Sequence, residues 1–279
     1  MNSNNSSRIS NADKRGPVFA GIRGLRALIL GAAVLMAGGQ SAGAVEWYTG
    51  DKTSDPDYAP SIVLDVSGSV TNKQSNFAAG AVTAAVEGNM QQTGFRAHAE
   101  ALGGVYSYYT SIKAVAPAVV DVQRKINAVE ENAGVLAGYA WVSRDWTFAL
   151  YAGMQVMNTT LNYNDPANSS QGLHIGAKIA GEFYGNPTKN TMVSGYGSYS
   201  TNANQYYSRF KAGYAAWGNV FIGPEFSALG NQYYAEYRAG VHLTGIKLSS
   251  LSLGLSGGVT DNPSTGTGAY GIVDARMGF

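Results

Sequence analysis

The sequence has 279 residues, of which 13% are charged and 36 are glycine, and its formal net charge is +1. Charged residues are about half as frequent as the roughly 25% found in soluble domains, and a net charge so close to zero argues against a nucleic-acid-binding protein. The absence of cysteine excludes a disulfide framework and a lipoprotein that is anchored through a cysteine.

The first segment has the features of a cleaved signal peptide, which we expect to span residues 1–44. Lys14, Arg15, Arg23 and Arg26 make its basic n-region. An apolar stretch at 27–35 follows, and Ala42-Gly-Ala44 supplies the small residues of a cleavage site. The alternative is a single membrane helix, but the apolar stretch is shorter than the roughly 18–20 residues that a span requires. We therefore expect a mature barrel domain of residues 45–279.

Near the start of this domain, the motif Asp65-Val-Ser67-Gly-Ser69 allows two interpretations. It matches the D-x-S-x-S motif with which von Willebrand factor A domains offer one carboxylate and two hydroxyls to a divalent cation. Alternatively, it belongs to a barrel strand in which these three polar side chains face the lumen. A von Willebrand-type domain requires alternating helices and buried strands further along the chain. The chain has β patterns there instead, so we predict no metal site and no cofactor.

From Pro60 onward the dominant pattern has a period of two, in segments that turn residues separate. In the segment 172–185, for example, Ile175 and Ile179 lie on one face while Lys178 and Glu182 lie on the other. Side chains alternate across a strand, so one face is apolar and the other polar. The predicted strands are 61–70, 77–89, 94–109, 133–143, 145–157, 172–185, 190–200, 205–218, 219–229, 232–246, 248–260 and 268–279.

This pattern predicts an all-β fold, an antiparallel up-and-down transmembrane β-barrel of about 12 strands with a range of roughly 10–14. An even strand number places both mature termini on one side of the membrane, which we expect to be the periplasm. The predicted location is the outer membrane of a Gram-negative cell. The expected partners are outer-membrane lipid and the barrel-assembly machinery, with no nucleic acid.

Residues 117–131 break the period of two. Val119, Val122, Ile126 and Val129 recur every three or four residues, and Pro117 lies near a first helical turn. We therefore predict a short amphipathic helix within the longest outer loop. The favoured place for this helix is the rim of the barrel, and the alternative is the lumen, where it would form a partial plug.

The lengths of the connections and the aromatic residues agree with this topology. The long connections 110–132 and 158–171 fall on the predicted outer side, and Trp141, Trp146 and Trp217 flank short periplasmic turns. The tyrosines at the predicted outer ends are Tyr106, Tyr108, Tyr109, Tyr199, Tyr206, Tyr207, Tyr233 and Tyr234. We predict that both groups form aromatic girdles at the membrane interfaces, and a second interpretation of the tyrosines is contact with sugar rings.

Charged side chains fall on the polar faces of the predicted strands, because a charge that faces lipid at mid-depth costs about 2–4 kcal/mol. The predicted lumen-facing set is Arg96, His98, Glu100, Lys178, Glu182, Arg209, Lys211, Glu225, Glu236, Arg238, Asp274 and Arg276. Both signs are present in similar number. We therefore predict ion pairs that either line a narrow polar passage or seal it.

The chain has only three histidines, His98, His174 and His242, and all fall on polar strand faces. An outer-membrane acyl hydrolase requires a Ser–His arrangement on the lipid-facing side, where its substrate lies. A protease of barrel type places histidine above the rim. Neither arrangement is present, so we predict hydrogen bonding in the lumen and no catalytic residue.

The last predicted strand, 268–279, places Val273, Ala275, Met277 and Phe279 on one apolar face. A strand that ends on a terminal aromatic residue resembles the assembly signal of Gram-negative outer-membrane β-barrels. We therefore predict that Phe279 is the assembly signal of this barrel.

Seven further stretches point to one family. They are Trp47-Tyr-Thr-Gly50, Ala59-Pro-Ser-Ile-Val-Leu-Asp65, Gly138-Tyr-Ala-Trp-Val142, Tyr199-Ser-Thr-Asn202, Tyr206-Tyr-Ser-Arg-Phe-Lys211, Gly223-Pro-Glu225 and Tyr270-Gly-Ile-Val-Asp-Ala-Arg276. Spread over nearly all of the mature chain, they resemble the cellulose-biosynthesis protein BcsS family of alphaproteobacteria. The resemblance implies an accessory role in making or exporting cellulose, with glucan and other cellulose-synthesis subunits as partners. It implies no catalytic residues.

Three hypotheses for the function follow. The first is a non-enzymatic outer-membrane barrel accessory to cellulose biosynthesis, which acts as a glucan conduit or docking protein. The second is an outer-membrane enzyme that acts on lipid or glycan. The third is a general porin or surface protein without a role in cellulose production.

Overall fold

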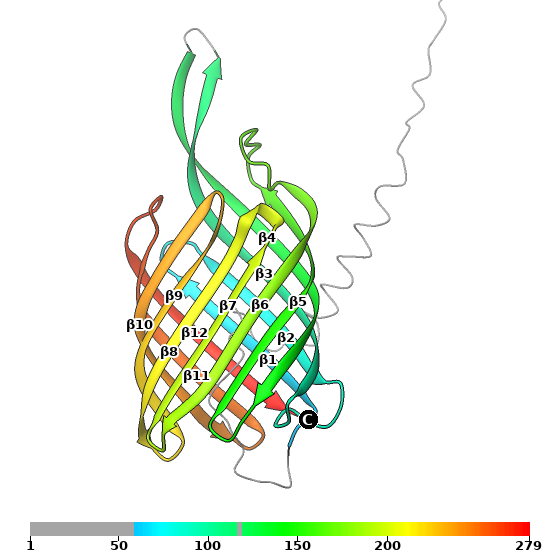
Figure 1. The fold of residues 1–279 in the computed structure, drawn as a ribbon. Coiled ribbons are helices and arrows are strands. Elements are labelled where there is room, and N and C mark those ends of the chain that lie inside the picture. Colours follow the sequence, from blue (N-terminus) through cyan, green and yellow to red (C-terminus); the bar gives the residue numbers. More distant parts are fainter. Residues whose placement is uncertain (1–58, 116–118) are drawn as a thin grey trace, which may run out of the picture. The chain divides into compact units, whose positions relative to one another are not determined.

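A computed structural model describes residues 59–115 and 119–279, which form twelve strands and one 3₁₀ helix, η1 (Asn202–Asn204) (Figure 1). The strands are β1 (Ile62–Thr71), β2 (Asn76–Ala85), β3 (Gly94–Val115), β4 (Val119–Val142), β5 (Trp146–Leu161), β6 (Gly172–Thr188), β7 (Thr191–Ser200), β8 (Gln205–Trp217), β9 (Val220–Asn231), β10 (Tyr234–Leu248), β11 (Leu251–Asp261) and β12 (Gly268–Gly278). No helix in this part of the chain is long and apolar enough to cross a membrane. The predicted signal peptide, residues 1–44, lies outside the described residues.

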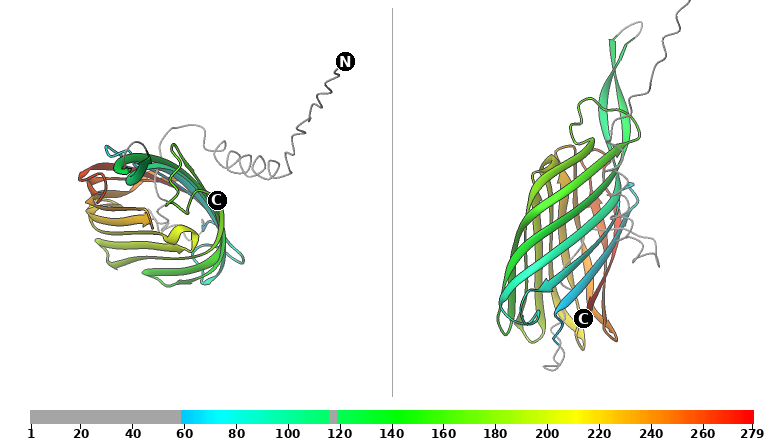
Figure 2. Two further views of the ribbon diagram at one scale, coloured as in Figure 1. Left: turned by 90° about the horizontal axis from the view of Figure 1, so that it is seen from above. Right: turned by 90° about the vertical axis from the view of Figure 1, so that its right-hand side faces the viewer.

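Each strand pairs antiparallel with the next along the chain, and β1 pairs with β12 to close the barrel (Figures 1 and 2). The pairing of β1 with β12 runs from Val63 opposite Gly278 to Thr71 opposite Tyr270. Phe279 extends it, because its N–H donates to the carbonyl of Ile62 at 2.8 Å. The closed, twelve-stranded, up-and-down barrel confirms the predicted fold class.

The antiparallel order sorts the connections into two groups, one at each end of the barrel. The end that carries Phe279 is called the terminal end, and its turns are 86–93, 143–145, 189–190, 218–219 and 249–250. The opposite end is called the loop end, and its described connections are 72–75, 162–171, 201–204, 232–233 and 262–267.

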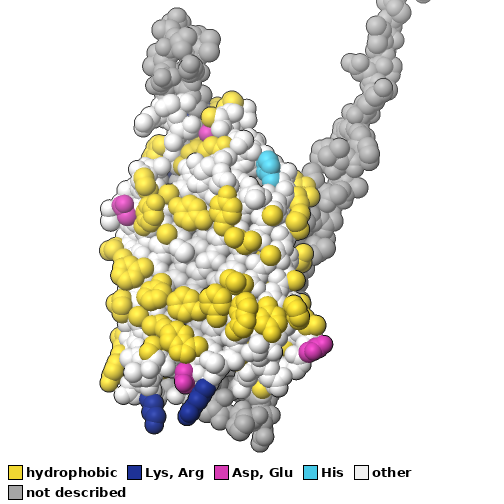
Figure 3. Space-filling view, viewed as in Figure 1, with side chains coloured by type: hydrophobic (Ala, Val, Ile, Leu, Met, Phe, Trp, Pro, Cys, Tyr) yellow, Lys and Arg dark blue, Asp and Glu magenta, His cyan; other side chains and the backbone are white. Residues whose placement is uncertain are grey.

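The outer surface of the barrel is apolar, as expected for strands with one face toward lipid. Ile175, Ile179 and Val241 are more than half exposed. On the face formed by β5 to β10, apolar side chains gather in two bands and charged side chains are few (Figure 3). Trp141 and Trp217 are exposed beside turns of the terminal end.

The tyrosines of the loop end divide between the two surfaces, so the prediction that all eight form a girdle is wrong. Tyr109 and Tyr199 are exposed, but Tyr106, Tyr108 and Tyr234 are only 1%, 3% and 5% exposed and lie in one interior cluster. The reason is strand parity. Tyr106 and Tyr108 occupy the same face of β3 as Glu100, which places their rings inside the barrel.

The described part of the predicted helix 117–131 is strand, so that prediction is wrong, while 117 and 118 lie outside the described residues. Strands β3 and β4 pair with each other as far as Val115 opposite Val119, whereas β4 stops pairing with β5 at Ala128. The two strands therefore project beyond the loop end as a hairpin (Figures 1 and 2). Valine and isoleucine are strand-forming residues, and β3 supplies hydrogen-bond partners along the whole length.

The stem of this hairpin offers a test of strand against helix. Ile126 is fully buried, while Val129, three residues later, is 45% exposed on the opposite face of β4. Ile126→Ala should lower the free energy of unfolding by about 2–5 kcal/mol, because it removes buried methyl groups, and Val129→Ala should change it by less than about 0.5 kcal/mol. Urea unfolding in detergent micelles measures both. Similar losses for the two variants would instead indicate a helix, in which residues three apart share a face.

Candidate functional site

The interior of the barrel has three regions along its axis. A pocket lies toward the loop end, a layer of ion pairs occupies the centre, and a wider vestibule opens at the terminal end. The pocket and the vestibule share no lining residue. We call them the loop-end pocket, the central ion-pair layer and the terminal-end vestibule.

The central ion-pair layer consists of Arg209 and Lys211 on β8, Glu225 on β9 and Asp274 on β12. Arg209 Nη2 is 2.7 Å from Glu225 Oε2 and 3.1 Å from Asp274 Oδ2, and Lys211 Nζ is 3.3 Å from Asp274 Oδ2. All four side chains are at most 1% exposed. Two cations and two carboxylates therefore balance each other, and the pairs with Asp274 connect β8 to β12, which is not its neighbour in the sheet.

Serine hydroxyls complete the hydrogen bonding of these carboxylates. Ser67 on β1 donates to Asp274 Oδ1 at 2.5 Å, and Ser256 on β11 donates to Glu225 Oε2 at 2.6 Å. A buried charge is stable only when it is both paired and hydrogen-bonded. The layer thus satisfies the condition under which charges persist in a low-dielectric interior.

The motif Asp65-Val-Ser-Gly-Ser69 lies on the interior face of β1, and its three polar side chains contact different residues. Ser67 contacts Asp274, Ser69 accepts a hydrogen bond from Arg238 Nη1 at 2.7 Å, and Asp65 Oδ1 is 3.8 Å from Arg276 Nε. Within the described residues, no group of three or more His, Cys, Asp or Glu side chains is placed to hold a metal ion. The alternating helices of a von Willebrand-type domain are also absent from this part of the chain.

The other members of the predicted lumen-facing set form smaller groups around the central layer. Arg238 Nε lies 2.6 Å from Glu236 Oε1 on β10. Lys178 on β6 forms an ion pair with Glu100 on β3, and His98 lies 3.7 Å from the same carboxylate. The ion pair of Lys178 with Glu100 links β6 to β3, which are not neighbours in the sheet, whereas the other two contacts lie within a single strand.

Two members of the set bond to groups outside it. Glu182 accepts a hydrogen bond from the Tyr151 hydroxyl at 2.7 Å. Arg96, which is buried, donates to the backbone carbonyl of Phe95 at 3.1 Å and to that of Gln92 in the turn 86–93.

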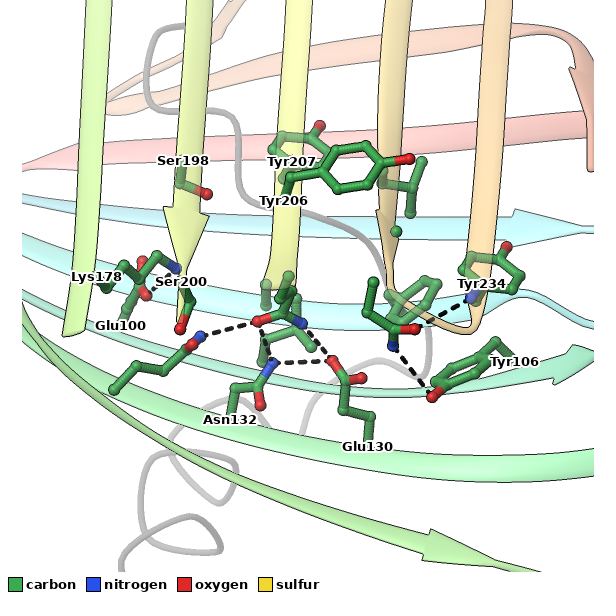
Figure 4. Close-up of a pocket in the computed structure, with 18 of the residues that line it drawn as sticks. Glu100, Tyr106, Glu130, Asn132, Lys178, Ser198, Ser200, Tyr206, Tyr207 and Tyr234 are labelled. Atoms are coloured by element: carbon green, nitrogen blue, oxygen red, sulfur yellow. Dashed lines mark hydrogen bonds and ion pairs between the residues drawn. The ribbon is translucent and has the colours of Figure 1, made fainter. Parts of the chain in front are cut away.

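The loop-end pocket contains a chain of amide and carboxylate side chains (Figure 4). Asn132 Nδ2 donates to Glu130 Oε1 at 2.9 Å, and Gln205 Nε2 donates to the same oxygen. Gln155 Nε2 donates to Gln205 Oε1 at 3.2 Å. Two acceptors of this chain, Asn132 Oδ1 and Gln155 Oε1, receive no hydrogen bond from the described residues, although both side chains are at least 97% buried.

Tyrosine rings form much of the wall of the pocket. Tyr106 and Tyr234 have ring centroids 4.8 Å apart, and those of Tyr196 and Tyr207 are 5.8 Å apart. Asn231 donates to the Tyr106 hydroxyl at 3.2 Å, which fixes that ring (Figure 4). The pocket therefore combines aromatic faces with hydrogen-bond acceptors.

Sequence reasoning placed Glu100 and Lys178 in the lumen but missed Glu130, Asn132, Gln155 and Gln205. Glu130 was not assigned to a strand face because the helical spacing of 117–131 predicts a helix there. The useful signal was parity, since Glu130 and Asn132 share one face of β4 with Leu136 and Ala140, which are also buried. Gln155 and Gln205 fall on polar strand faces but carry no charge.

One histidine takes part in an arrangement that resembles a catalytic triad. Thr83 Oγ1 is 2.8 Å from His98 Nδ1, and Glu100 is on the other side of the ring. However, neither Thr83 nor His98 lines the loop-end pocket or the terminal-end vestibule. His242 bonds to Thr244 Oγ1 at 2.8 Å, and His174 lies 3.2 Å from the carbonyl of Gln171.

Together, the closed barrel, its apolar outer face and its charged interior define a β-barrel of the outer-membrane type. The family model "cellulose biosynthesis protein BcsS" matches residues 66–279, and the chain belongs to this family. This confirms the resemblance seen in the sequence. No curated protein matches the sequence.

Several solved structures have a similar barrel. The KdgM porin is 12% identical, with a TM-score of 0.41, and the match covers 78% of this chain and 99% of the porin. The "TodX deltaS2S3 mutant monoaromatic hydrocarbon channel" is 7% identical, with a TM-score of 0.42 and coverages of 78% and 89%. LpxR from Salmonella typhimurium is 12% identical, with a TM-score of 0.40 and coverages of 78% and 99%. These values are too low to transfer a ligand or an activity to this chain.

The central ion-pair layer should be sensitive to the loss of one member. Asp274→Ala leaves Arg209 and Lys211 buried with a single carboxylate, so the free energy of unfolding should fall by about 3–5 kcal/mol. Urea unfolding of the refolded barrel measures this loss. Asp261→Ala, at the exposed loop-end terminus of β11, is the matched control and should cost less than about 1 kcal/mol. Equal, small effects of both variants would contradict a stabilising role for the layer.

Proposed function

We propose that this protein is a non-enzymatic outer-membrane barrel that assists cellulose biosynthesis or export by docking glucan in its loop-end pocket. Membership of the BcsS family supports the link to cellulose. The observation that carries the docking role is the pair of unpartnered acceptors, Asn132 Oδ1 and Gln155 Oε1, in a tyrosine-walled pocket.

The chemistry of glucan fits these groups. A buried acceptor that receives no hydrogen bond costs about 1–3 kcal/mol, and a sugar hydroxyl is a neutral donor that removes this cost. Tyrosine rings present flat apolar faces, on which the C–H faces of a pyranose ring pack. The pocket's lysine, Lys178, is already paired with Glu100. The site therefore favours a neutral polysaccharide over an anionic one.

The central ion-pair layer supports docking rather than passage through the barrel. Arg209, Glu225 and Asp274 bridge the interior between the loop-end pocket and the terminal-end vestibule, and their side chains are at most 1% exposed. A polymer that passed through would have to separate buried ion pairs, each at a cost of about 3–5 kcal/mol. We infer that glucan enters the loop-end pocket and stops there.

The lengths of the connections support an orientation in which the loop end faces the cell exterior and the terminal end faces the periplasm. The ten-residue loop 162–171 and the projecting β3–β4 hairpin lie at the loop end, whereas 143–145, 189–190, 218–219 and 249–250 are tight turns. Outer-membrane barrels have short periplasmic turns and longer outer loops. The proposal includes removal of residues 1–44 as a signal peptide and insertion by the barrel-assembly machinery.

Glucan docking predicts that the two unpartnered acceptors contribute to affinity. Asn132→Leu with Gln155→Met keeps the volume of both side chains but removes the acceptors. The double variant should bind a soluble cello-oligosaccharide about tenfold more weakly or worse, because each hydrogen bond contributes about 1 kcal/mol. Isothermal titration calorimetry on the detergent-solubilised barrel measures the affinity.

The control for this experiment is Gln232→Met, an exposed glutamine at the loop end that does not line the pocket. It should leave the affinity unchanged. In cells, the double variant should fail to restore extracellular cellulose in a deletion strain while total glucan synthesis stays normal. If the assembled wild-type barrel binds no cello-oligosaccharide, the docking proposal is wrong. That result would favour a porin without a role in cellulose production.

Phe279 gives a separate test of the proposed location and assembly. Its backbone already closes the barrel through hydrogen bonds to Ile62 and Ser61, and its side chain is 57% exposed. Phe279→Ala keeps the backbone bonds but removes the aromatic ring, so we expect less heat-modifiable barrel in the outer-membrane fraction and accumulation of unassembled protein in the periplasm. Phe279→Trp should assemble normally. Normal assembly of the alanine variant would refute the assembly-signal role.

A further inference from the structure

We propose that the loop 162–171 is a strap that closes the mouth of the loop-end pocket, and that a ligand enters only when this strap is released. The loop joins β5 to β6, and hydrogen bonds fasten it to Tyr108 on β3 and to Tyr233 in the turn between β9 and β10. The inference rests on the proposed function for the identity of the ligand, glucan, whereas closure by the strap is testable without glucan.

The strap has a buried face and an exposed face. Asp165, Asn168 and Ser170 are only 4%, 5% and 2% exposed, whereas Tyr163 and Ser169 are exposed. Polar side chains of a surface loop normally point into solvent, so the burial of these three means that the loop packs down onto the barrel. Ser170 donates to Asn168 Oδ1 through its backbone N–H at 2.9 Å and its hydroxyl at 2.5 Å, which holds this face in one conformation.

The first fastening point is the hydroxyl of Tyr108. It donates to Asp165 Oδ2 at 2.9 Å and accepts a hydrogen bond from Asn168 Nδ2 at 2.7 Å. The Tyr108 side chain is buried and belongs to the interior cluster of the loop end. Because the acceptor on Asp165 is a carboxylate, this bond is about twice as strong as one between neutral groups. The strap is therefore held from inside the barrel.

The second fastening point is the hydroxyl of Tyr233. It accepts a hydrogen bond from the backbone N–H of Ser169 at 2.7 Å and lies 2.8 Å from Ser169 Oγ. Gln232 Nε2 also donates to Ser169 Oγ, at 3.0 Å, but this contact is exposed and water replaces it at little cost. The strap is thus fastened on two sides, at β3 and at the turn 232–233.

The two fastening points form a bridge across the lumen. The ring of Tyr233 stacks against that of Tyr108, with centroids 6.5 Å apart. Around the closed barrel, five strands separate β3 from β9 in either direction, β4 to β8 one way and β2, β1, β12, β11 and β10 the other. The two rings therefore meet from opposite walls, and the strap rests on this bridge.

The strap covers the half of the barrel that carries the unpartnered acceptors. Strands β4 to β8 form this half, and they supply Asn132, Gln155 and Gln205 to the loop-end pocket. The strap is rooted between β5 and β6, near the middle of the same half, and is fastened to the bridge at its edge. A glucan chain that approaches Asn132 Oδ1 or Gln155 Oε1 from the loop end therefore has to displace the strap.

The fastening is of a kind that opens. The buried side chains of the strap are all polar, and its apolar residues Pro166 and Ala167 are exposed. Segments with few buried apolar contacts open at a low free-energy cost, and lids of this kind open within microseconds to seconds. Gly172, at the β6 end of the strap, has a φ of +94°, which favours glycine, and thus provides a hinge. The pocket is then accessible at the rate at which the strap opens.

The absence of cysteine from the chain permits a direct test of closure. Ser198→Cys places one thiol in the loop-end pocket, and Thr147→Cys places one in the terminal-end vestibule as the matched control. Tyr108→Phe with Tyr233→Phe removes both fastening hydroxyls and keeps both rings. In the detergent-solubilised barrel, this change should accelerate maleimide labelling of Ser198→Cys about tenfold or more and leave labelling of Thr147→Cys unchanged.

A second variant removes hydrogen bonds from the side of the strap. Asp165→Ala with Asn168→Ala takes away both partners of the Tyr108 hydroxyl and should also accelerate labelling of Ser198→Cys. Tyr163→Phe, on the exposed face of the strap, should not. Only preparations with heat-modifiable gel mobility are compared. Wild-type labelling rates of Ser198→Cys in both double variants would overturn the proposal.

Binding kinetics separate the strap from the docking site. A pocket that is competent only when open binds with an affinity reduced by the open fraction. Tyr108→Phe with Tyr233→Phe should therefore bind a cello-oligosaccharide about tenfold more tightly, through faster association, as surface plasmon resonance measures. Weaker binding with unchanged labelling of Ser198→Cys would overturn the strap, because the hydroxyls would then be sugar contacts. Faster labelling without any cello-oligosaccharide binding would support the strap and refute glucan docking.

Discussion

The constraint on which the rest of this structure depends is that every residue of a closed barrel strand faces either lipid or the interior. Closure between β1 and β12 removes the sheet edges, so every strand position within the barrel wall lies on the lipid side or on the interior side. Charges on the strand segments that form the barrel wall are therefore forced inward, where they must neutralise one another. Arg209, Lys211, Glu225 and Asp274 do so with two charges of each sign and with hydroxyls from Ser67 and Ser256.

This constraint also explains why the interior differs from one end to the other. In the centre, ion pairs link β8 to both β9 and β12, while toward the loop end the inward positions carry tyrosines and amides. At the terminal end most of the charged lining residues are basic. A single alternating pattern thus produces three chemically distinct regions, because the residue type at inward positions changes with depth.

The strand positions could be predicted from the sequence because the period of two alone indicates them. Prediction failed where parity conflicted with another signal. The valines and isoleucine of 117–131 have helical spacing, but pairing with β3 makes the described part of this segment strand and turns Ile126 and Glu130 inward. A tyrosine near a strand end is typical of an aromatic girdle. Tyr106 is interior because it shares a face of β3 with Glu100. Contacts such as that of Asn132 with Glu130 depend on side-chain directions, which no periodicity encodes.

A balanced, buried ion-pair layer suits a protein that holds a neutral polymer at the cell surface. A lumen with one dominant sign would select and conduct ions, whereas equal charges that are already paired offer ions no net attraction. The layer would then preserve the permeability barrier of the outer membrane while the loop-end pocket remains accessible. On the proposed function, the passage of glucan across the membrane belongs to another component of the cellulose machinery. The role left to this barrel is to retain or orient the chain after it has emerged, and that role requires acceptors and aromatic faces at one end only.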